Sequence, residues 1–290
     1  MTYQYYPGCS LTASAREYDL ATRAVMAAAG VKLTEIDGWT CCGASAAAPI
    51  SQLLSLSLGA RNLALAEQAT DDDQVLVPCS ACYLNLKKAN DALRNDTESR
   101  ASINEALSAV NLTATGSVRV RHLLEVLATD LGAQHLAPLM KRSLSGLIGA
   151  PYYGCQCLRP YKEFDDPERP VSMEPLIETT GAAVYPWEMA ARCCGASLVS
   201  TQPKVGLARV SAILKAARGA DLIVTVCPMC QMNLDAWQSK ASRMAGEELS
   251  ITVLYLPQLL GLAMGLDSDE LGLDLNLVIE NGFREKLACC

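Results

Sequence analysis

Residues 39–46 read WTCCGASA, and this stretch decides the fold because the chain contains it twice. Its partner is residues 191–198, ARCCGASL. Three more blocks repeat in the same order: YYPGCSL (5–11) with YYGCQCL (152–158), VLVPCSACYLNL (75–86) with IVTVCPMCQMNL (223–234), and VRHLLEVLATDLG (120–132) with VLYLPQLLGLAMG (253–265). Ordered self-similarity indicates a repeated structural unit. The sequence therefore predicts a tandem duplication, with domains at 1–146 and 147–290.

Each half alternates short apolar stretches with longer helical ones. The expected strands are 31–36, 74–77, 118–121, 222–226 and 252–254, and the expected helices are 18–29, 51–69 and 204–218. Strands that alternate with helices indicate βαβ units and a parallel sheet. The predicted fold class is α/β, with two pseudo-symmetric halves that each hold a small, mostly parallel sheet and flanking helices. The cysteines then fall at strand ends, where such folds place ligand sites.

Composition excludes several classes of protein. The 290 residues carry a net charge of -7 and a pI near 5.0, whereas a duplex nucleic-acid binder needs a basic face. The first residues lack the basic and apolar regions of a secretory signal, and no run of about 20 large apolar residues predicts a membrane span. We expect a cytoplasmic protein. In a reducing compartment, thirteen cysteines favour metal binding or redox chemistry.

Five cysteines recur in each half. They are Cys9, Cys41, Cys42, Cys79 and Cys82 in the first, and Cys155, Cys193, Cys194, Cys227 and Cys230 in the second. Disulfides suit neither the compartment nor an odd number per half. A structural zinc site would use four thiolates and leave a fifth unused. Iron–sulfur clusters, which spread thiolates over several iron atoms, suit adjacent cysteines, and the sequence favours them.

The paired C…CCG…CxxC pattern resembles the family of heterodisulfide reductase B subunits, which carry paired CCG, or cysteine-rich, domains. The resemblance extends to residues 59–69, 118–125, 165–170 and 227–235, and it covers nearly the whole chain. It implies two noncubane [4Fe-4S] clusters, one in each half, held by the ten repeated cysteines.

The resemblance also implies an activity. Such a protein reduces a disulfide or other small sulfur substrate between its clusters, or runs the reaction in reverse. Electrons come from a ferredoxin-like C subunit and a flavin-bearing A subunit. The chain itself contains neither a dinucleotide fingerprint nor a ferredoxin cysteine run, so a partner must supply electrons. An alternative is that the clusters only relay electrons, in a CCG-domain subunit of a respiratory or fumarate/succinate-type oxidoreductase.

Several residues beside the cysteines are candidates for roles at the clusters. Gly43 and Gly195 follow the vicinal pairs, and we expect them next to the clusters, where a Cβ would be crowded. His122 and Tyr255 occupy matching positions after a last strand. They are the candidate catalytic residues, because a proton donor would assist developing thiolates. The alternative for His122 is a hydrogen-bonded structural histidine.

Other polar side chains near the motifs have less specific roles. Arg159 and Arg192 flank cysteine motifs and are candidates for the wall of a shared substrate cleft. Cys157 has no counterpart in the first half, so it is either a packed thiol or a nucleophile on the substrate side. Cys289 and Cys290 end the sequence, and we expect them to be exposed thiols.

Overall fold

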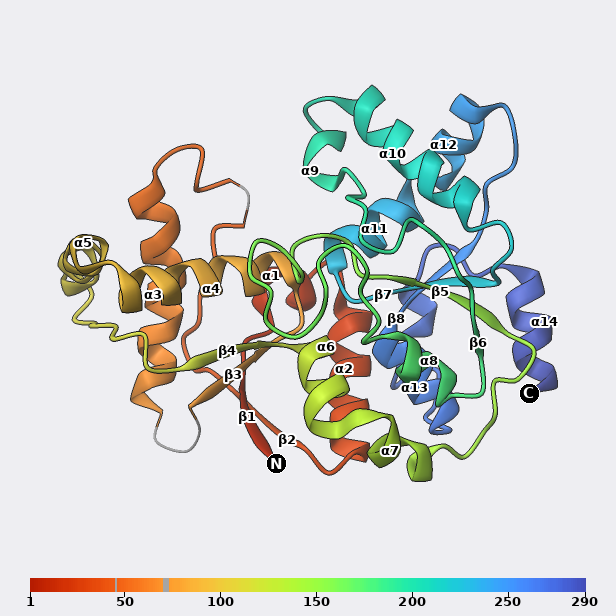
Figure 1. The fold of residues 1–290 in the computed structure, drawn as a ribbon, viewed down its shortest axis with the longest axis horizontal. Coiled ribbons are helices and arrows are strands. Elements are labelled where there is room, and N and C mark those ends of the chain that lie inside the picture. The colour runs from red at the N-terminus through yellow and green to blue at the C-terminus, as the bar shows by residue number, and fades with distance from the viewer. Residues whose placement is uncertain (45, 70–72) are drawn as a thin grey trace.

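Two four-stranded parallel sheets, one in each half, organise the computed structural model, which describes residues 1–44, 46–69 and 73–290 (Figure 1). The first sheet has the order β2-β1-β3-β4 and the second the order β6-β5-β7-β8. The strands are β1 (Thr2–Tyr5), β2 (Lys32–Glu35), β3 (Gln74–Val77), β4 (Arg119–His122), β5 (Ile148–Tyr152), β6 (Ala183–Val184), β7 (Leu222–Thr225) and β8 (Thr252–Tyr255). The predicted fold class is confirmed.

Strand register repeats between the halves as well. Val75 of β3 pairs with Val120 of β4, and Ile223 of β7 pairs with Val253 of β8. The central strands β3 and β7 are apolar and almost wholly buried, as expected for parallel strands covered on both faces.

Helices connect the strands and cover the sheets. In the first half they are α1 (Gly8–Thr12), α2 (Arg16–Ala28), α3 (Gln52–Gln68), α4 (Ser80–Asn95), α5 (Thr97–Ser108), α6 (Leu123–Glu125), the π-helix η1 (Val126–Leu131), α7 (Gly132–Leu136) and the 3-10 helix η2 (Ala137–Leu139). In the second half they are α8 (Glu174–Glu178), α9 (Ala196–Val199), α10 (Pro203–Ala216), α11 (Pro228–Ala236), α12 (Gln238–Ala245), α13 (Leu256–Ala263), the 3-10 helix η3 (Leu273–Leu275) and α14 (Asn281–Cys289). Local signals set several ends: Ser51 caps α3 by accepting the Leu54 N–H, and Pro228 begins α11.

The two halves share a hydrophobic core. Helix α2 of the first half packs against α13 of the second, between the sheets (Figure 1). The larger apolar cluster contains Val25 and Leu63 from one half and Leu254 and Leu259 from the other. A core that crosses the predicted boundary at residue 146 holds the halves together by burying apolar surface.

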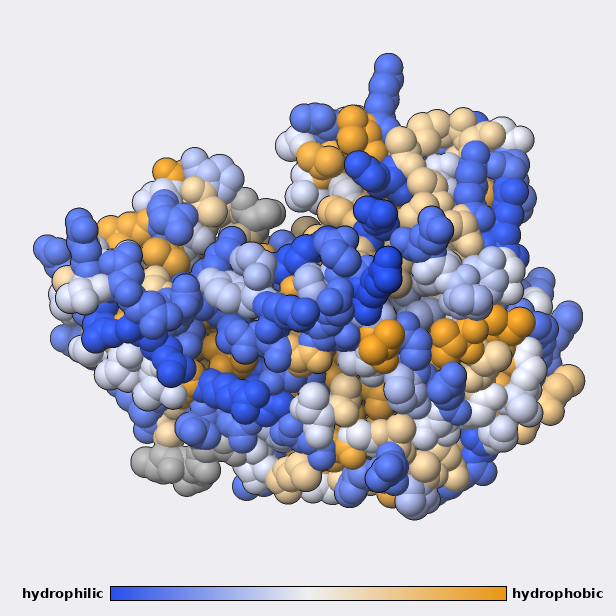
Figure 2. All heavy atoms as spheres, viewed as in Figure 1, coloured by the Kyte–Doolittle hydropathy of each residue, from blue (hydrophilic) through white to orange (hydrophobic). Residues whose placement is uncertain are grey.

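The surface is mostly polar on the face shown in Figure 2, and it is hollowed between the part that carries α3 and the part that carries α9 and α10. Among the described residues, no helix combines the length and the apolar character needed to span a bilayer.

Candidate metal centres

The ten repeated cysteines lie at the carboxyl ends of the strands. Cys9 follows β1, the vicinal pair Cys41 and Cys42 follows β2, and Cys79 follows β3. Cys82 lies in the first turn of α4. The second half places its five cysteines in the same way after β5, β6 and β7 and in α11. Because the strands are parallel, the cysteine-bearing segments of a half meet at one sheet edge.

In the first half the five thiols are mutual neighbours. The Cys9 and Cys41 sulfurs are 3.8 Å apart, and the Cys42 and Cys82 sulfurs are 3.3 Å apart. Cys79 is hydrogen-bonded to Cys82. The structure therefore brings together all five cysteines that the sequence groups in this half.

The second half repeats this arrangement around a cavity of about 110 Å³. The Cys194 and Cys230 sulfurs are 3.5 Å apart, and Cys155 is hydrogen-bonded to Cys193. All five thiols of the half line the cavity, together with Tyr153, Gln156, Ala196, Ser197, Met229 and Ser80, the last of which belongs to the first half.

Exposure follows the same pattern in both sets. Cys9, Cys41 and Cys193 are exposed and Cys155 is partly so. The second cysteine of each vicinal pair and both cysteines of each CxxC are buried. Each site therefore has one face toward solvent and one toward the core.

Two glycines that sequence analysis did not select lie directly against the thiols. A Cβ on Gly8 would lie 2.8 Å from the Cys82 sulfur, and a Cβ on Gly154 would lie 2.9 Å from the Cys230 sulfur. Both have positive φ angles, +73° in each case, which favour glycine. Their shared position in the first repeated block was the signal that could have identified them.

At Gly43 and Gly195 the atoms that would crowd a Cβ differ from those expected. Both glycines have positive φ, 82° and 78°, and the Gly195 N–H donates to the Cys193 sulfur at 3.4 Å, but beyond the adjacent residues an added Cβ would meet no sulfur. A Cβ on Gly43 would meet Ala47 and Leu58, and a Cβ on Gly195 would meet Arg209 and Gly206. These glycines form the CCG turn and let the next helix pack closely, so crowding there comes from helix packing.

Matching polar side chains hold the CCG turns. Asn85 of α4 donates to the Cys42 and Ala44 carbonyls, at 3.1 and 2.8 Å, and Asn233 of α11 donates to the Cys194 carbonyl at 2.8 Å. These asparagines also lie in a repeated block, three residues after each CxxC.

Two buried tyrosines fix the residue before each vicinal pair. The Tyr6 hydroxyl donates to the Thr40 carbonyl at 2.7 Å, and the Tyr152 hydroxyl donates to the Arg192 carbonyl at 2.6 Å. Burial, and then the neighbouring thiols, raises the pKa of both phenols, so they remain neutral donors.

Neighbouring groups divide the thiols into poorer and better acids. Partial burial, and then Cys41, raises the pKa of Cys9 to about 11. A hydrogen bond from Cys82 lowers the pKa of Cys42 to about 7. A hydrogen bond from Cys155, assisted by the Gly195 N–H and the Arg209 charge, lowers the pKa of Cys193 to about 5. One cysteine of each vicinal pair, Cys42 or Cys193, and Cys227 of the second CxxC therefore supply thiolates more readily than Cys9, and the thiolate is the form that binds metals.

The family model for the CCG cysteine-rich domain matches this chain twice, at residues 3–87 and 150–235. The chain belongs to the CCG cysteine-rich domain family. Each match spans one set of five cysteines, so the CCG duplication predicted from the repeats is confirmed.

Full-length relatives come from two kinds of oxidoreductase. The chain is 38% identical over 280 residues to the 8-methylmenaquinol:fumarate reductase membrane anchor subunit of Wolinella succinogenes, covering 95% of this chain and 96% of that protein. It is 32% identical to the B subunit of the ferredoxin/F(420)H(2)-dependent CoB-CoM heterodisulfide reductase of Methanosarcina acetivorans, covering 97% and 95%. The predicted relationship to the B subunits of heterodisulfide reductases is confirmed.

A solved structure shares the fold. A hypothetical protein from Helicobacter pylori superimposes with a TM-score of 0.78, at 19% identity, over 95% of this chain and 51% of that one. This likeness concerns the fold alone.

The donor set of each CCG half fits an iron–sulfur cluster. Within the described ranges, no three His, Cys, Asp or Glu side chains are arranged around a single metal ion. A structural zinc site needs four ligands around one ion, whereas a cluster distributes its thiolates over several iron atoms. Five thiols lie at each site, and one glycine backbone in each half lies directly against a thiol.

His122 and Tyr255 lie in the core rather than in a cleft wall. Both are fully buried. The His122 Nδ1 accepts the Leu124 N–H, and burial lowers the pKa of this imidazole to about 3. Tyr255 stacks on Tyr18 with ring centroids 4.0 Å apart, and burial raises the pKa of its phenol. His122 ends β4 and Tyr255 ends β8, and both side chains are buried at the junction between the halves, away from solvent.

The two arginines differ in environment. Arg159 pairs with Glu168 and donates to the Ala191 carbonyl, and its charge helps to lower the pKa of Cys193. Arg192 lines a separate cavity of about 670 Å³ that contains no repeated cysteine. Of the two, the structure places Arg159 beside the thiols.

The three unrepeated cysteines lie outside the two sets. Cys157 is buried, and its thiol donates to the Tyr153 carbonyl at 3.3 Å. Burial raises its pKa to about 12, which makes it a packed thiol. Cys289 is exposed and Cys290 is partly buried.

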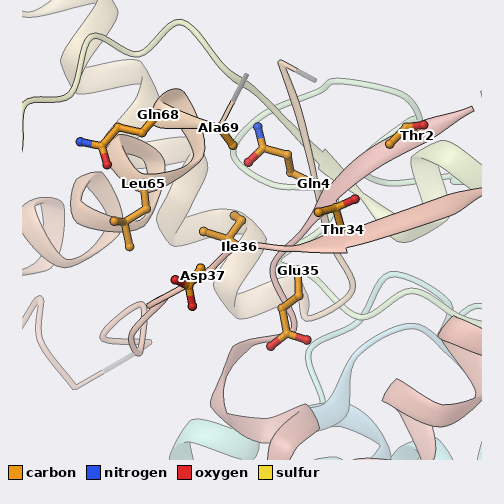
Figure 3. Close-up of a pocket in the computed structure, with 9 residues that line it drawn as sticks. All are labelled: Thr2, Gln4, Thr34, Glu35, Ile36, Asp37, Leu65, Gln68 and Ala69. Carbon is orange, nitrogen blue, oxygen red and sulfur yellow. The ribbon is translucent and has the colours of Figure 1, made fainter. Parts of the chain in front are cut away.

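A further cavity, larger than the one lined by the second set of thiols, is lined by other residues. It measures about 340 Å³ between β2 and the end of α3, where Glu35, Asp37 and Gln68 lie along its wall (Figure 3). None of the ten repeated cysteines lines it.

Proposed function

We propose that each CCG half holds one noncubane [4Fe-4S] cluster through its five repeated cysteines. When bound, such clusters accept and release single electrons. The chain supplies the thiolates, the glycine backbones that make room beside Cys82 and Cys230, and the hydrogen bonds that fix the CCG turns.

The function that the geometry supports best is electron relay inside an oxidoreductase complex. One observation carries this proposal: the Tyr18 hydroxyl lies 3.2 Å from the carbonyl oxygens of both Pro78 and Val226. Those residues directly precede Cys79 and Cys227. A single buried side chain therefore bridges the two CxxC segments, and a short path through the protein joins the two sites.

The relatives suggest the kind of complex. The 38% identity to a quinol:fumarate reductase subunit favours a respiratory or fumarate/succinate-type enzyme. The partners would be a flavin-bearing subunit and a ferredoxin-like subunit, because electrons must enter and leave through other chains. A reducing, cytoplasmic setting suits thirteen free thiols.

Metal analysis of anaerobically purified chain tests the cluster proposal. We expect about eight iron atoms and about eight acid-labile sulfides per chain, with absorption in the 400 nm region. Zinc without iron would contradict the proposal.

Disulfide reduction is the second candidate. It is favoured by the solvent-facing thiols Cys9, Cys41 and Cys193, by the hollow in the surface (Figure 2), and by the relative from a heterodisulfide reductase. In that reaction two electrons and two protons break one S–S bond and give two thiols.

A reoxidation experiment separates the two functions. The tagged chain is isolated anaerobically from its own organism with its partners, reduced, and mixed with a small disulfide or with fumarate. Relay predicts that the complex is reoxidised by fumarate and releases no thiol above a disulfide-only blank. Two new thiols per two electrons would instead establish disulfide reduction.

A further inference from the structure

Ser80 belongs to the CxxC of the first half, yet its side chain lies in the site of the second half. It lines the same cavity as Cys227 and Cys230. Its hydroxyl oxygen is 3.2 Å from the Val226 carbonyl oxygen, and the residue is 1% exposed. One half therefore contributes a buried hydroxyl to the other half's site.

His122 determines which way that hydroxyl donates. Because the His122 Nδ1 accepts the Leu124 N–H, the ring proton must lie on Nε2. Nε2 is 3.1 Å from the Ser80 oxygen and is also hydrogen-bonded to the Pro78 backbone carbonyl, so the protonated Nε2 cannot accept the Ser80 proton. The serine's own proton then points across the junction, toward the Val226 carbonyl oxygen and the Cys157 and Cys227 sulfurs. A Cys227 thiolate, being charged, is the stronger acceptor.

The arrangement has no counterpart in the other direction. The repeat alignment pairs Ser80 with Pro228, which has no donor, and pairs His122 with Tyr255, which stacks on Tyr18. The second site therefore receives a hydrogen-bond donor from Ser80, whereas the first site receives none from Pro228.

We propose that Ser80, oriented by His122, is a positioning residue that hydrogen-bonds the Cys227 thiolate and makes the second centre easier to reduce than the first. This rests on the proposed iron–sulfur clusters. A hydrogen bond to a ligand sulfur favours the more negative, reduced state, so it raises the reduction potential.

An anaerobic redox titration followed by electron paramagnetic resonance tests the proposal. In the unmodified chain the second-half signal should titrate at the higher potential. Cys42→Ala and Cys194→Ala, each of which alters one half, assign the signals. In Ser80→Ala the reduction equilibrium of the second centre should fall about tenfold, about 59 mV for one electron, while the first centre stays unchanged.

Two further variants provide a control and a second test of the Ser80 hydrogen bond. Ser57→Ala removes a buried hydroxyl with no hydrogen-bond partner among the described residues, and it should leave both potentials unchanged. His122→Phe keeps a ring without a donor and should shift the second centre in the same direction as Ser80→Ala, by less.

The outcomes are distinguishable. Equal potentials in the unmodified chain, or a Ser80→Ala variant in which both centres or neither centre moves, would overturn this inference and leave the clusters in place. A chain without iron would instead overturn the proposed function. If Ser80→Ala does not fold, two measurements still test the inference. They are the order of the two reduction potentials in the unmodified chain and the shift of the second centre's potential in His122→Phe.

Discussion

Gly8 and Gly154 show how closely the backbone approaches the thiols. Alanine at either position would place a Cβ 2.8 or 2.9 Å from a cysteine sulfur, so the sulfur would have to move. We expect Gly8→Ala and Gly154→Ala each to lose iron from its own half only, measured as iron per chain. Gly30→Ala is the matched control, because Gly30 has φ +72° with nothing within 4 Å of its Cβ. Equal loss of iron in all three variants would mean that backbone strain is responsible.

A buried carboxyl at the junction predicts a pH dependence of stability. Glu17 is 4% exposed, and burial, with a smaller contribution from Asp235, raises its pKa from 4.5 to about 7. Between these values the unfolded chain has released the proton that the folded chain still holds. The free energy of unfolding therefore falls as pH rises from 4.5 to about 7.

Glu17→Gln removes the titrating carboxyl, and with it this fall in the free energy of unfolding. At pH 8 the variant should be more stable than the unmodified chain by roughly 1–3 kcal/mol, and the difference should vanish at about pH 4.5. Unfolding of the loaded chain at both pH values measures it, with the exposed Glu105→Gln as control. A difference independent of pH would show that the Glu17 proton is not involved.

Residue type and the internal repeat together predicted the ten cysteines, because few other side chains bind iron–sulfur clusters and only ten of the thirteen cysteines recur in both halves. It did not identify Gly8, Asn85 or Tyr6, which act through backbone position and hydrogen bonds. Those contacts depend on loops that meet only after the strands have paired. The burial of His122 was hidden for the same reason: a residue at the end of a strand can face a cleft or a neighbouring half.

At the scale of the element, α4 both supplies Cys82 and holds the CCG turn through Asn85. Asn85→Ala removes two hydrogen bonds to that turn. We expect a loss of about 1–3 kcal/mol together with a lower iron content in the first half. Asn90→Ala, in the same helix, loses bonds of 3.3 and 2.9 Å to the Gly116 and Val118 carbonyls, and it should lose stability but keep iron. If both variants keep full iron, Asn85 has no special link to the site.

Apolar and helical runs predicted several elements well. The expected strand 74–77 is β3 itself, and the helix expected at 51–69 is α3 with Ser51 as its cap. The strand β6 was not predicted because two residues, Ala183–Val184, carry no periodicity. The order of the strands in each sheet could not be predicted from local sequence patterns either, since it depends on how the helices cross between strands.

At the scale of the whole molecule, the two centres should be separable. Cys42→Ala should alter the visible and paramagnetic spectra of the first centre while sparing the second, and Cys194→Ala should do the reverse. The reason is that each five-thiol set comes from one sheet. Loss of both centres in either variant would show that the halves assemble their clusters together. Unchanged spectra would show that the vicinal pairs are not fully engaged.

The core that runs from α2 to α13 bears on the origin of the duplication. A single ancestral half would have exposed these apolar faces, and the simplest cover is a second copy related by a two-fold axis. Fusion of such a homodimer into one gene would free the two copies to diverge. Ser80 against Pro228 is one trace of that divergence, because an ancestor of two identical subunits could only have had two identical sites.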